Sequence, residues 1–264
     1  MSSITSKTAL VTGGGSGIGL AIAERLASDG AHVAICGRTE DKLVAAGEQI
    51  AASVGAGGSI RHIVADVTIE EQIAAAAAFA AEPEGGLDIC VANAGGSMHM
   101  GDMEDFDAEA VRATIDLNMI GTMLTVKHSI PLMRGRDDAG SVVAISSGAG
   151  GFPHRLLWAY GASKAGIDMF CRSAADELGP DIRVNSVQPG IVDDELMSFI
   201  TAGGPLLDNY IENMPLGRVG TVTDVAEAVR FLAGPESSWV TGMNMPIDGG
   251  HHLRAGADYS KLLG

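Results

Sequence analysis

The sequence predicts an α/β fold: a single domain whose doubly wound parallel sheet has about seven strands and carries helices on both faces. Three observations predict this fold. Short apolar runs alternate with longer helical stretches, which is typical of parallel sheets joined by right-handed helical crossovers. The short runs are almost continuously apolar, as in strands that are covered on both faces. No stretch rich in Pro, Gly and Ser divides the 264 residues, so we expect one domain at 1–264.

The strands are predicted at the short, β-branched runs. In chain order these are TALVT (8–12), HVAIC (32–36), IRHIVA (60–65), LDICVA (87–92), SVVAIS (141–146), IRVNSVQ (182–188) and NMPI (244–247). Helices are predicted between them, at 17–28, 40–53, 69–81, 108–134, 157–178 and 222–233. The alanine-rich stretch at 74–81 predicts a helix that packs closely against the sheet.

Two segments fall outside this alternation. Residues 190–214 have weak periodicity, and connections of that length usually act as lids or are disordered. We therefore expect a substrate lid at 191–214. The C-terminal extension at 250–264 looks too apolar to be free in solvent, and we expect it at an oligomer interface. Its adjacent His251 and His252 suit a surface or interface pair better than a metal site, and we expect no metal.

Composition and charge narrow the class of partner. The net charge of −16 would repel nucleic acid and anionic membranes, so neither is expected as a partner. Three widely spaced cysteines with no CxxC pair indicate buried thiols in a reducing compartment. The N-terminal residues show no signal-peptide pattern, and no apolar run approaches the length of a membrane span. We expect a cytoplasmic protein.

A glycine-rich turn connects the first predicted strand to the first predicted helix. A helix N-terminus presents unpaired N–H groups and the positive end of the helix dipole. Glycines at that point let a pyrophosphate approach the backbone. The order of strand, turn, helix and second strand therefore predicts a Rossmann-like dinucleotide site rather than a turn that binds nothing. The residues expected to bind the cofactor in this turn are Gly13, Gly15, Ser16, Gly17, Ile18 and Gly19.

The stretch YGASK contains a tyrosine and a lysine that a helix would bring together. Tyr160 and Lys164 are separated by four positions, so the phenol and the ammonium share one helix face. A positive charge near the phenol would lower its pKa from about 10 and make it a usable acid or base. Ser147 follows a predicted strand, where it could hold a substrate oxygen. We expect these three residues to be catalytic, with Ser147 and Tyr160 contacting substrate.

These motifs together resemble those of the short-chain dehydrogenases/reductases. The resemblance consists of TGxxxGIG from Thr12, NAG at 93–95, Asn118, Ser147 thirteen positions before Tyr160, YGASK, and PG at 189–190, all in family order. It covers roughly residues 5 to 250. It implies an oxidoreductase that transfers a hydride between a nicotinamide cofactor and an alcohol or ketone.

The resemblance also implies roles for residues that their local sequence does not reveal. Asn118 would take part in a proton relay with Lys164. The family usually has Thr four residues after the glycine of PG, and this chain has Asp194 there, which leaves that contact open. The resemblance further implies a homotetramer. Additional cofactor contacts implied by the family are Asp66, Val67, Asn93, Ala94, Gly95, Tyr160, Lys164, Pro189, Gly190, Val192 and Asp194.

The end of the second strand predicts the choice between NAD and NADP. An acidic residue there would bind the ribose hydroxyl of NAD, whereas Gly37 has no carboxylate and Arg38 follows it. A guanidinium pairs well with the extra phosphate of NADP. We expect NADP(H) to be favoured over NAD(H), although Ser16 stands where many NADP-dependent relatives carry a basic residue.

The expected substrate is a mainly apolar secondary alcohol or ketone, either alicyclic, aromatic or acyl. Apolar residues dominate the segments expected around the site, and His154 could hydrogen-bond a polar group of the substrate. Arg134, Arg136 and Arg155 keep a 3-oxoacyl-thioester reductase open as an alternative. A catalytically silent cofactor sensor or scaffold is the alternative of another class. That alternative is disfavoured because Asn118, Ser147, Tyr160 and Lys164 are all present.

Overall fold

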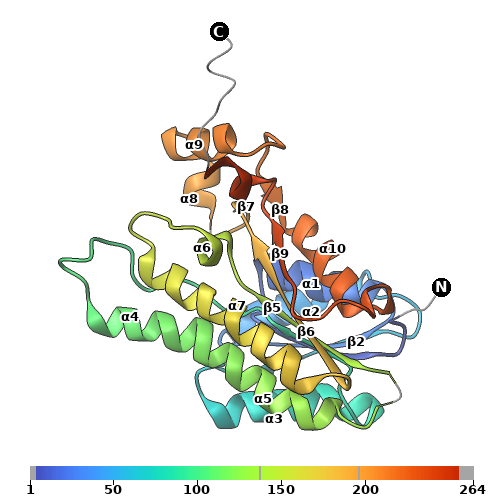
Figure 1. The fold of residues 1–264 in the computed structure, drawn as a ribbon. Helices are drawn as coiled ribbons and strands as arrows, with labels where there is room; N and C mark the ends of the chain where they lie inside the picture. Colours follow the sequence, from blue (N-terminus) through green and yellow to red (C-terminus); the bar gives the residue numbers. More distant parts are fainter. Residues whose placement is uncertain (1–3, 137, 196, 256–264) are drawn as a thin grey trace.

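A seven-stranded sheet forms the centre of the molecule (Figure 1). The computed structural model describes residues 4–136, 138–195 and 197–255. All strand pairs in this sheet are parallel, in the order β3-β2-β1-β4-β5-β6-β9. The predicted fold class is confirmed, with strand boundaries shifted by two residues or fewer. The strands are β1 (Thr8–Thr12), β2 (His32–Gly37), β3 (Ser59–Val64), β4 (Ile89–Ala92), β5 (Gly140–Ile145), β6 (Ile182–Pro189) and β9 (Asn244–Ile247).

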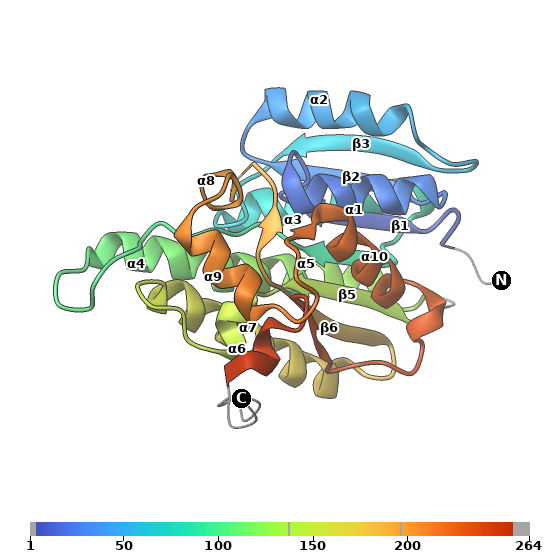
Figure 2. The same ribbon diagram turned by 90° about the horizontal axis from the view of Figure 1, so that it is seen from above.

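Helices cover both faces of the sheet because successive strand residues point to opposite sides. Leu10 of β1 belongs to one core with Ile73 and Ile167, whereas Ala9 and Val11 belong to the other. The second core is covered by α1 (Gly17–Ser28), α2 (Glu40–Ala51) and α10 (Val222–Ala233). The first core is covered by α3 (Glu70–Ala81), α5 (Gly121–Met133) and α7 (Trp158–Leu178), and α4 (Ala108–Ile115) packs against α7 (Figure 2).

The expected helix at 108–134 contains a π-helical turn, η2 (Asp116–Ile120), between α4 and α5. A π turn inserts one extra residue into a helix and is frequent at functional sites. The short 3-10 helices η1 (Glu82–Glu84) and η3 (Pro235–Ser237) follow α3 and α10. These irregular turns leave no clear mark in the hydrophobic pattern.

The expected lid has its own small core. It contains β7 (Val192–Asp193), α8 (Ser198–Thr201) and α9 (Pro205–Asn213), and β7 pairs with β8 (Gly220–Thr221). Ile191, Ile200 and Met214 are buried together beneath these elements. Figure 1 shows α8 and α9 side by side at one end of the molecule. The short α6 (Gly148–Gly151) and η4 (His251–Ala255) complete the described chain, and the rest of the expected C-terminal extension lies outside the described residues.

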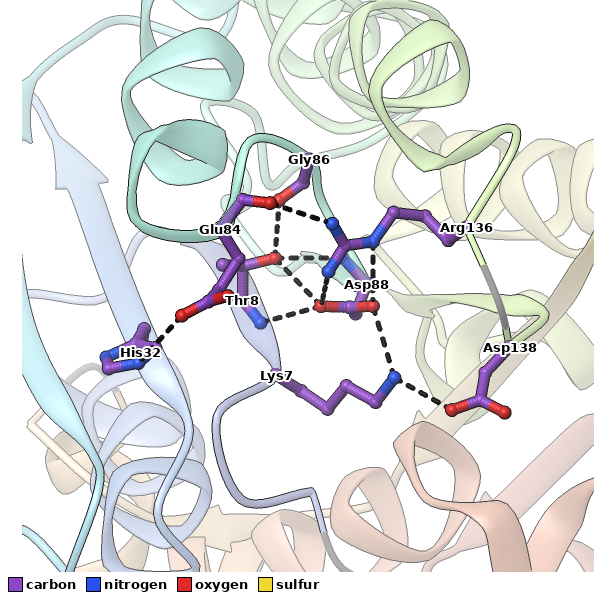
Figure 3. Close-up of polar contacts among 8 residues, drawn as sticks. All are labelled: Lys7, Thr8, His32, Glu84, Gly86, Asp88, Arg136 and Asp138. Atoms are coloured by element: carbon purple, nitrogen blue, oxygen red, sulfur yellow. Dashed lines mark hydrogen bonds and ion pairs between the residues drawn. The ribbon is translucent and has the colours of Figure 1, made fainter.

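A polar network ties together the amino ends of β1 and β4 (Figure 3). Buried Asp88 accepts hydrogen bonds from the Thr8 backbone N–H at 2.9 Å and from Arg136 Nη2 at 2.9 Å. Lys7 Nζ lies 3.4 Å from the same carboxylate. Burial alone would raise the pKa of Asp88, but hydrogen bonds from Arg136 and Thr8 and the charge of Lys7 leave it below its ordinary value. These contacts therefore hold the amino ends of β1 and β4 in place.

The cysteines and the lengths of the helices bear on two expectations from the sequence. Cys36, Cys90 and Cys171 are buried and free, as expected, and burial raises the pKa of Cys36 to about 12. Among the helices that the structure describes, none combines the length and apolar character that crossing a bilayer requires.

Candidate active site

The glycine turn after β1 packs its backbone too tightly for side chains. Gly13 and Gly17 adopt φ values of +67° and +55°, a region that favours glycine. A Cβ at Gly19 would lie 2.2 Å from the carbonyl oxygen of Gly13. Ser16 precedes α1 and makes no side-chain hydrogen bond to the first turn. The N–H groups that begin α1 are therefore free of a side-chain cap and fit an anion such as a pyrophosphate.

Asn93 and Ala94, which follow β4, hold this turn in place. The Asn93 side-chain amide donates to the carbonyl oxygen of Thr12 at 2.9 Å, and the N–H groups of both residues donate to Thr12 Oγ1. Asn93 Nδ2 also lies 2.9 Å from the position that a Cβ of Gly13 would take. The described contacts of Asn93 thus order the cradle itself, which is a supporting role beside the predicted cofactor contact.

Ser147, Tyr160 and Lys164 meet at the carboxyl end of β5. Ser147 follows β5, and its side chain caps α6 by accepting from the Ala149 N–H at 3.1 Å. A hydrogen bond between the Ser147 hydroxyl and Tyr160 lowers the pKa of the phenol. Lys164 lies one turn along α7, and its Nζ is 5.5 Å from the centre of the Tyr160 ring. The three predicted residues are brought together.

The electrostatics of this group differ from the expectation. Burial is the largest influence on Tyr160 and raises its pKa, with a further increase from nearby Tyr210. Burial lowers the pKa of Lys164 to about 8, although Asp168 acts in the opposite direction. Lys164 Nζ donates to the carbonyl oxygen of Ile145 at 2.7 Å. The expected lowering of the phenol's pKa by Lys164 is therefore wrong for this structure, because burial dominates and the ammonium is directed to the backbone.

Asn118 lies on the π turn and bonds to the loop after β4. Its Nδ2 donates to the carbonyl oxygens of Gly96 at 2.6 Å and Thr114 at 2.7 Å, and its Oδ1 accepts from the Gly96 N–H. A Cβ at Gly95 would lie 2.6 Å from Asn118 Oδ1 and 3.1 Å from Lys164 Nζ. Asn118 and Lys164 thus approach each other across Gly95, as a proton relay between them requires.

The residues expected near the adenosine differ in what their side chains can do. Arg38 is exposed just after β2 and has no ion-pair partner within the described part of the chain. Asp66 Oδ1 accepts from the N–H and hydroxyl of Thr68, so this carboxylate is occupied by its own turn. The Val67 side chain is buried and packs beside Gly121. Only the backbone of Val67 remains suited to the predicted contact.

Asp194 extends from the lid to the beginning of α1. Its Oδ2 lies 3.0 Å from the position that a Cβ of Gly17 would take, and its Oδ1 accepts from the Met197 N–H at 2.8 Å. The neighbouring Glu195 forms an exposed ion pair with Lys42 of α2. A lid carboxylate therefore stands beside the predicted pyrophosphate cradle. Pro189 ends β6, Gly190 packs against Asp248, and Val192 is buried in β7.

An aromatic group at the mouth of this site contains residues that the sequence did not indicate. His154, Tyr210 and His251 come from the loop after α6, from α9 and from η4. Their rings contact one another, and Phe152 packs against the two imidazoles. His251 and His252, which we expected as a surface or interface pair, have different neighbours. His252 Nδ1 lies 2.8 Å from Asp248 Oδ2, whereas His251 packs against Tyr210 and Phe152. Tyr210 and His251 were missed because tertiary folding alone brings them here.

A cavity of about 680 Å³ lies beside the catalytic group. It is bounded by residues 101–103, 149–158 and part of α7, and it includes Phe152 and His154 but neither Ser147 nor Tyr160. It therefore adjoins the aromatic group without containing the side chains that we predict to be catalytic. The candidate site is better defined by the convergence of Ser147, Tyr160 and Lys164 than by this cavity.

Comparisons with known proteins agree with this geometry. The family model described as "Enoyl-(Acyl carrier protein) reductase" matches residues 13–252. The chain is 39% identical to the trans-4-hydroxycyclohexanecarboxylate dehydrogenase of Sinomonas cyclohexanicum, over 94% of this chain and 93% of that protein. A solved short-chain type dehydrogenase/reductase from Mycobacterium ulcerans is similar, with a TM-score of 0.93, 43% identity, and coverage of 99% and 95% of the two chains. A Burkholderia cenocepacia short chain dehydrogenase solved in complex with NADP gives a TM-score of 0.85 and 33% identity, with coverage of 94% and 99%.

Proposed function

The chain belongs to the short-chain dehydrogenase/reductase family of oxidoreductases, and from that premise we propose that it transfers a hydride between a nicotinamide dinucleotide and a ring-bearing secondary alcohol or ketone. The observation that carries this proposal is the convergence of Ser147, Tyr160 and Lys164 beside the glycine turn. The fit of the dinucleotide rests on that turn, since Gly13, Gly17 and Gly19 leave bare backbone at the start of α1.

The protein's own groups would hold the dinucleotide and move the proton. When bound, the nicotinamide supplies or accepts the hydride. The uncapped N–H groups at the start of α1 would bind the pyrophosphate. Tyr160, whose pKa is raised, is a neutral phenol near pH 7 and would donate a proton to a ketone oxygen that Ser147 also holds. With a pKa of about 8, Lys164 can exchange a proton near neutral pH. Asn118, which lies with Lys164 beside Gly95, would take part in the relay that carries this proton.

We further propose that NADP(H) is preferred to NAD(H). Arg38 is exposed immediately after Gly37 at the end of β2, with no described partner to compete for its guanidinium. A guanidinium readily donates two parallel hydrogen bonds to the oxygens of a phosphate. The similar Burkholderia cenocepacia protein was solved with NADP. Steady-state kinetics with each dinucleotide test this preference, and a higher kcat/KM with NAD(H) would overturn it.

The substrate class is proposed from the site and from one relative. Phe152, His154 and Tyr210 provide aromatic walls, and the similar Sinomonas protein is named for a hydroxylated cyclohexane ring. The acyl-thioester alternative stays open through Arg155, which lines the cavity beside His154. The other two arginines do not support it, because Arg136 binds Asp88 at the amino ends of the strands. Arg134 lies 4.0 Å from Asp181, away from the catalytic group.

A screen of cyclic alcohols and ketones with both dinucleotides, followed by absorbance of the reduced nicotinamide, tests the proposed reaction. Tyr160→Phe should lower kcat by about a thousandfold or more, because a general acid–base group contributes on that scale. Dinucleotide binding, followed by fluorescence titration, should remain. Unchanged turnover in Tyr160→Phe would refute the proposal. A wild type that binds neither dinucleotide would also refute it, and a scaffold role would then remain as the alternative.

Assembly and location are proposed on narrower grounds. We propose a homotetramer, since the Trp239 side chain is fully exposed and Met169 leaves an apolar face on α7 open to a second copy. A cytoplasmic location is supported by three free, buried cysteines. Light scattering that gives the mass of one chain would refute the tetramer.

A further inference from the structure

We propose that His154, Tyr210 and His251 form a subsite for a carboxylate carried on the ring of the substrate, away from the carbon that is oxidised or reduced. This inference rests on the proposed hydride transfer, because it assigns a second recognition point to the same site. It concerns three side chains from three separate segments of the chain.

The three rings form a nearly equal-sided triangle. Ring centres are 6.3 Å apart for His154 and Tyr210, 5.3 Å for Tyr210 and His251, and 6.2 Å for His154 and His251. Phe152 lies against both imidazoles, at 4.9 Å and 5.0 Å. Rings at these separations are in contact, so a small planar group would bind across their polar edges, with the Phe152 ring as an apolar wall beside it.

Most of the polar atoms of this triangle are unused. His154 Nδ1 lies 3.3 Å from the carbonyl oxygen of Phe152, and no hydrogen bond involves the His251 ring or the Tyr210 hydroxyl among the residues described. A neutral imidazole donates from one nitrogen, and a phenol donates its hydroxyl hydrogen. Because the N–H of neutral His154 already donates to the Phe152 carbonyl, the triangle offers two donors, from His251 and Tyr210, and His154 contributes a ring wall. A carboxylate, which only accepts hydrogen bonds and has two oxygens, can satisfy both donors.

The protein's own carboxylates do not compete for these donors. The nearest, Asp248, is buried and accepts from the N–H groups of Gly250 and His252 and from the His252 ring. Burial lowers the pKa of both His154 and His251, so without a bound anion the imidazoles are neutral near pH 7. The charge of Asp248 acts on His251, but the Asp248 oxygens are bound to Gly250 and His252, and the triangle itself contains no carboxylate.

The triangle is also within reach of the reacting group. Tyr210 lies close enough to raise the pKa of Tyr160, and His154 is on the segment that connects Ser147 to α7. A ring-sized substrate could therefore present its hydroxyl to Tyr160 and its carboxylate to the triangle. The alternative is that the rings only pack the lid against η4, in which case their polar atoms have no role.

The test compares substrates of one shape. We would measure kcat/KM for trans-4-hydroxycyclohexanecarboxylate, its methyl ester and trans-4-methylcyclohexanol. The wild type should favour the carboxylate by about tenfold or more, since a hydrogen bond to a charged group is worth about one factor of ten or better. His251→Phe and Tyr210→Phe, which keep the rings, should remove about tenfold for the carboxylate alone. His62→Phe, which changes an exposed histidine of β3, is the matched control and should leave all three values unchanged.

The outcomes separate this inference from the proposed function. Equal values for the three alcohols, or an equal fall for all three in the variants, would overturn the subsite and leave hydride transfer standing. If no alcohol is oxidised, calorimetric titration with cyclohexanecarboxylate and cyclohexylmethanol still decides. Heat from the carboxylate alone, lost in His251→Phe, would support the subsite while the proposed reaction fails, and no heat from either would refute both.

Discussion

At the scale of single residues, the site combines groups whose protonation is set by burial. Tyr160 has a raised pKa and Lys164 a pKa of about 8, so the amine loses its proton well before the phenol, whereas the two free side chains titrate close together. The hydrogen bond from Ser147 is the one described contact that stabilises the phenolate. Alcohol oxidation requires that phenolate, so its rate should rise with pH.

Ser147→Ala should move this rise to higher pH. The lost hydrogen bond stabilised the charged phenol, so its removal raises the pKa of Tyr160 further and shifts the alkaline limb of the kcat/KM profile upward. The rate at neutral pH should fall by about a hundredfold, because the substrate oxygen also loses a donor. Ser146→Ala is the control, since Ser146 donates to the carbonyl oxygen of Lys164 instead. An unshifted profile in the Ser147 variant would contradict this role.

Gly95→Ala should disturb the relay. The new Cβ would lie 2.6 Å from Asn118 Oδ1 and 3.1 Å from Lys164 Nζ, so both side chains would have to move. We expect kcat to fall by about tenfold or more, since a displacement of about 1 Å at a catalytic group has that effect. Gly96→Ala meets nothing closer than 4.0 Å and should stay within about twofold of the wild type. Similar kinetics for the two variants would argue against the relay.

At the scale of elements, the predicted lid places a carboxylate beside the proposed cradle for the pyrophosphate. Asp194 lies beside Gly17, where the diphosphate is proposed to bind, and like charges repel at short range. Asp194→Asn keeps an oxygen for the Met197 N–H and removes the charge. We expect the Kd for either dinucleotide to fall about three- to tenfold in fluorescence titration. Asp193→Asn is the control, and weaker binding in Asp194→Asn would show that the carboxylate assists the cofactor.

The elements that could be predicted are those with a local signal. The helix at Gly17–Ser28 and the strand at Asn244–Ile247 have the predicted boundaries, because glycines or an apolar run delimit them. The π turn around Asn118 and the short helices of the lid were not predicted, because contacts distant in sequence determine them. The same holds for Tyr210 and His251, which come together only when α9 packs near η4. Ser147, Tyr160 and Lys164 were predictable because their spacing is local and their chemistry is specific.

At the scale of the whole molecule, the residues proposed for catalysis lie at the carboxyl ends of the strands. The Asp88 network, which we expect to stabilise the fold, lies at their amino ends. The carboxyl ends of β1, β4 and β5 lead into the glycine turn, Asn93 and Ser147, whereas the amino ends of β1 and β4 meet the Asp88 network. The network joins backbone groups and charged side chains (Figure 3), and none of its members belongs to the predicted catalytic group. A change there should therefore affect folding while leaving catalysis intact.

Asp88→Asn tests this separation. The amide loses the charge that binds Arg136 and Lys7, and we expect the free energy of unfolding at pH 7 to fall by about 1–3 kcal/mol, since both cations are partly exposed. Asp138→Asn, at an exposed partner of Lys7, should cost less than about 0.5 kcal/mol. Because the folded-state pKa of Asp88 lies below its unfolded value, its contribution is present above about pH 4 and is lost as the pH falls through the folded pKa. Urea unfolding should accordingly show the difference between wild type and Asp88→Asn narrowing towards pH 3. A difference in unfolding free energy that does not change with pH would contradict the role of the Asp88 charge. An altered KM in the variant would mean that the network and the active site are not independent.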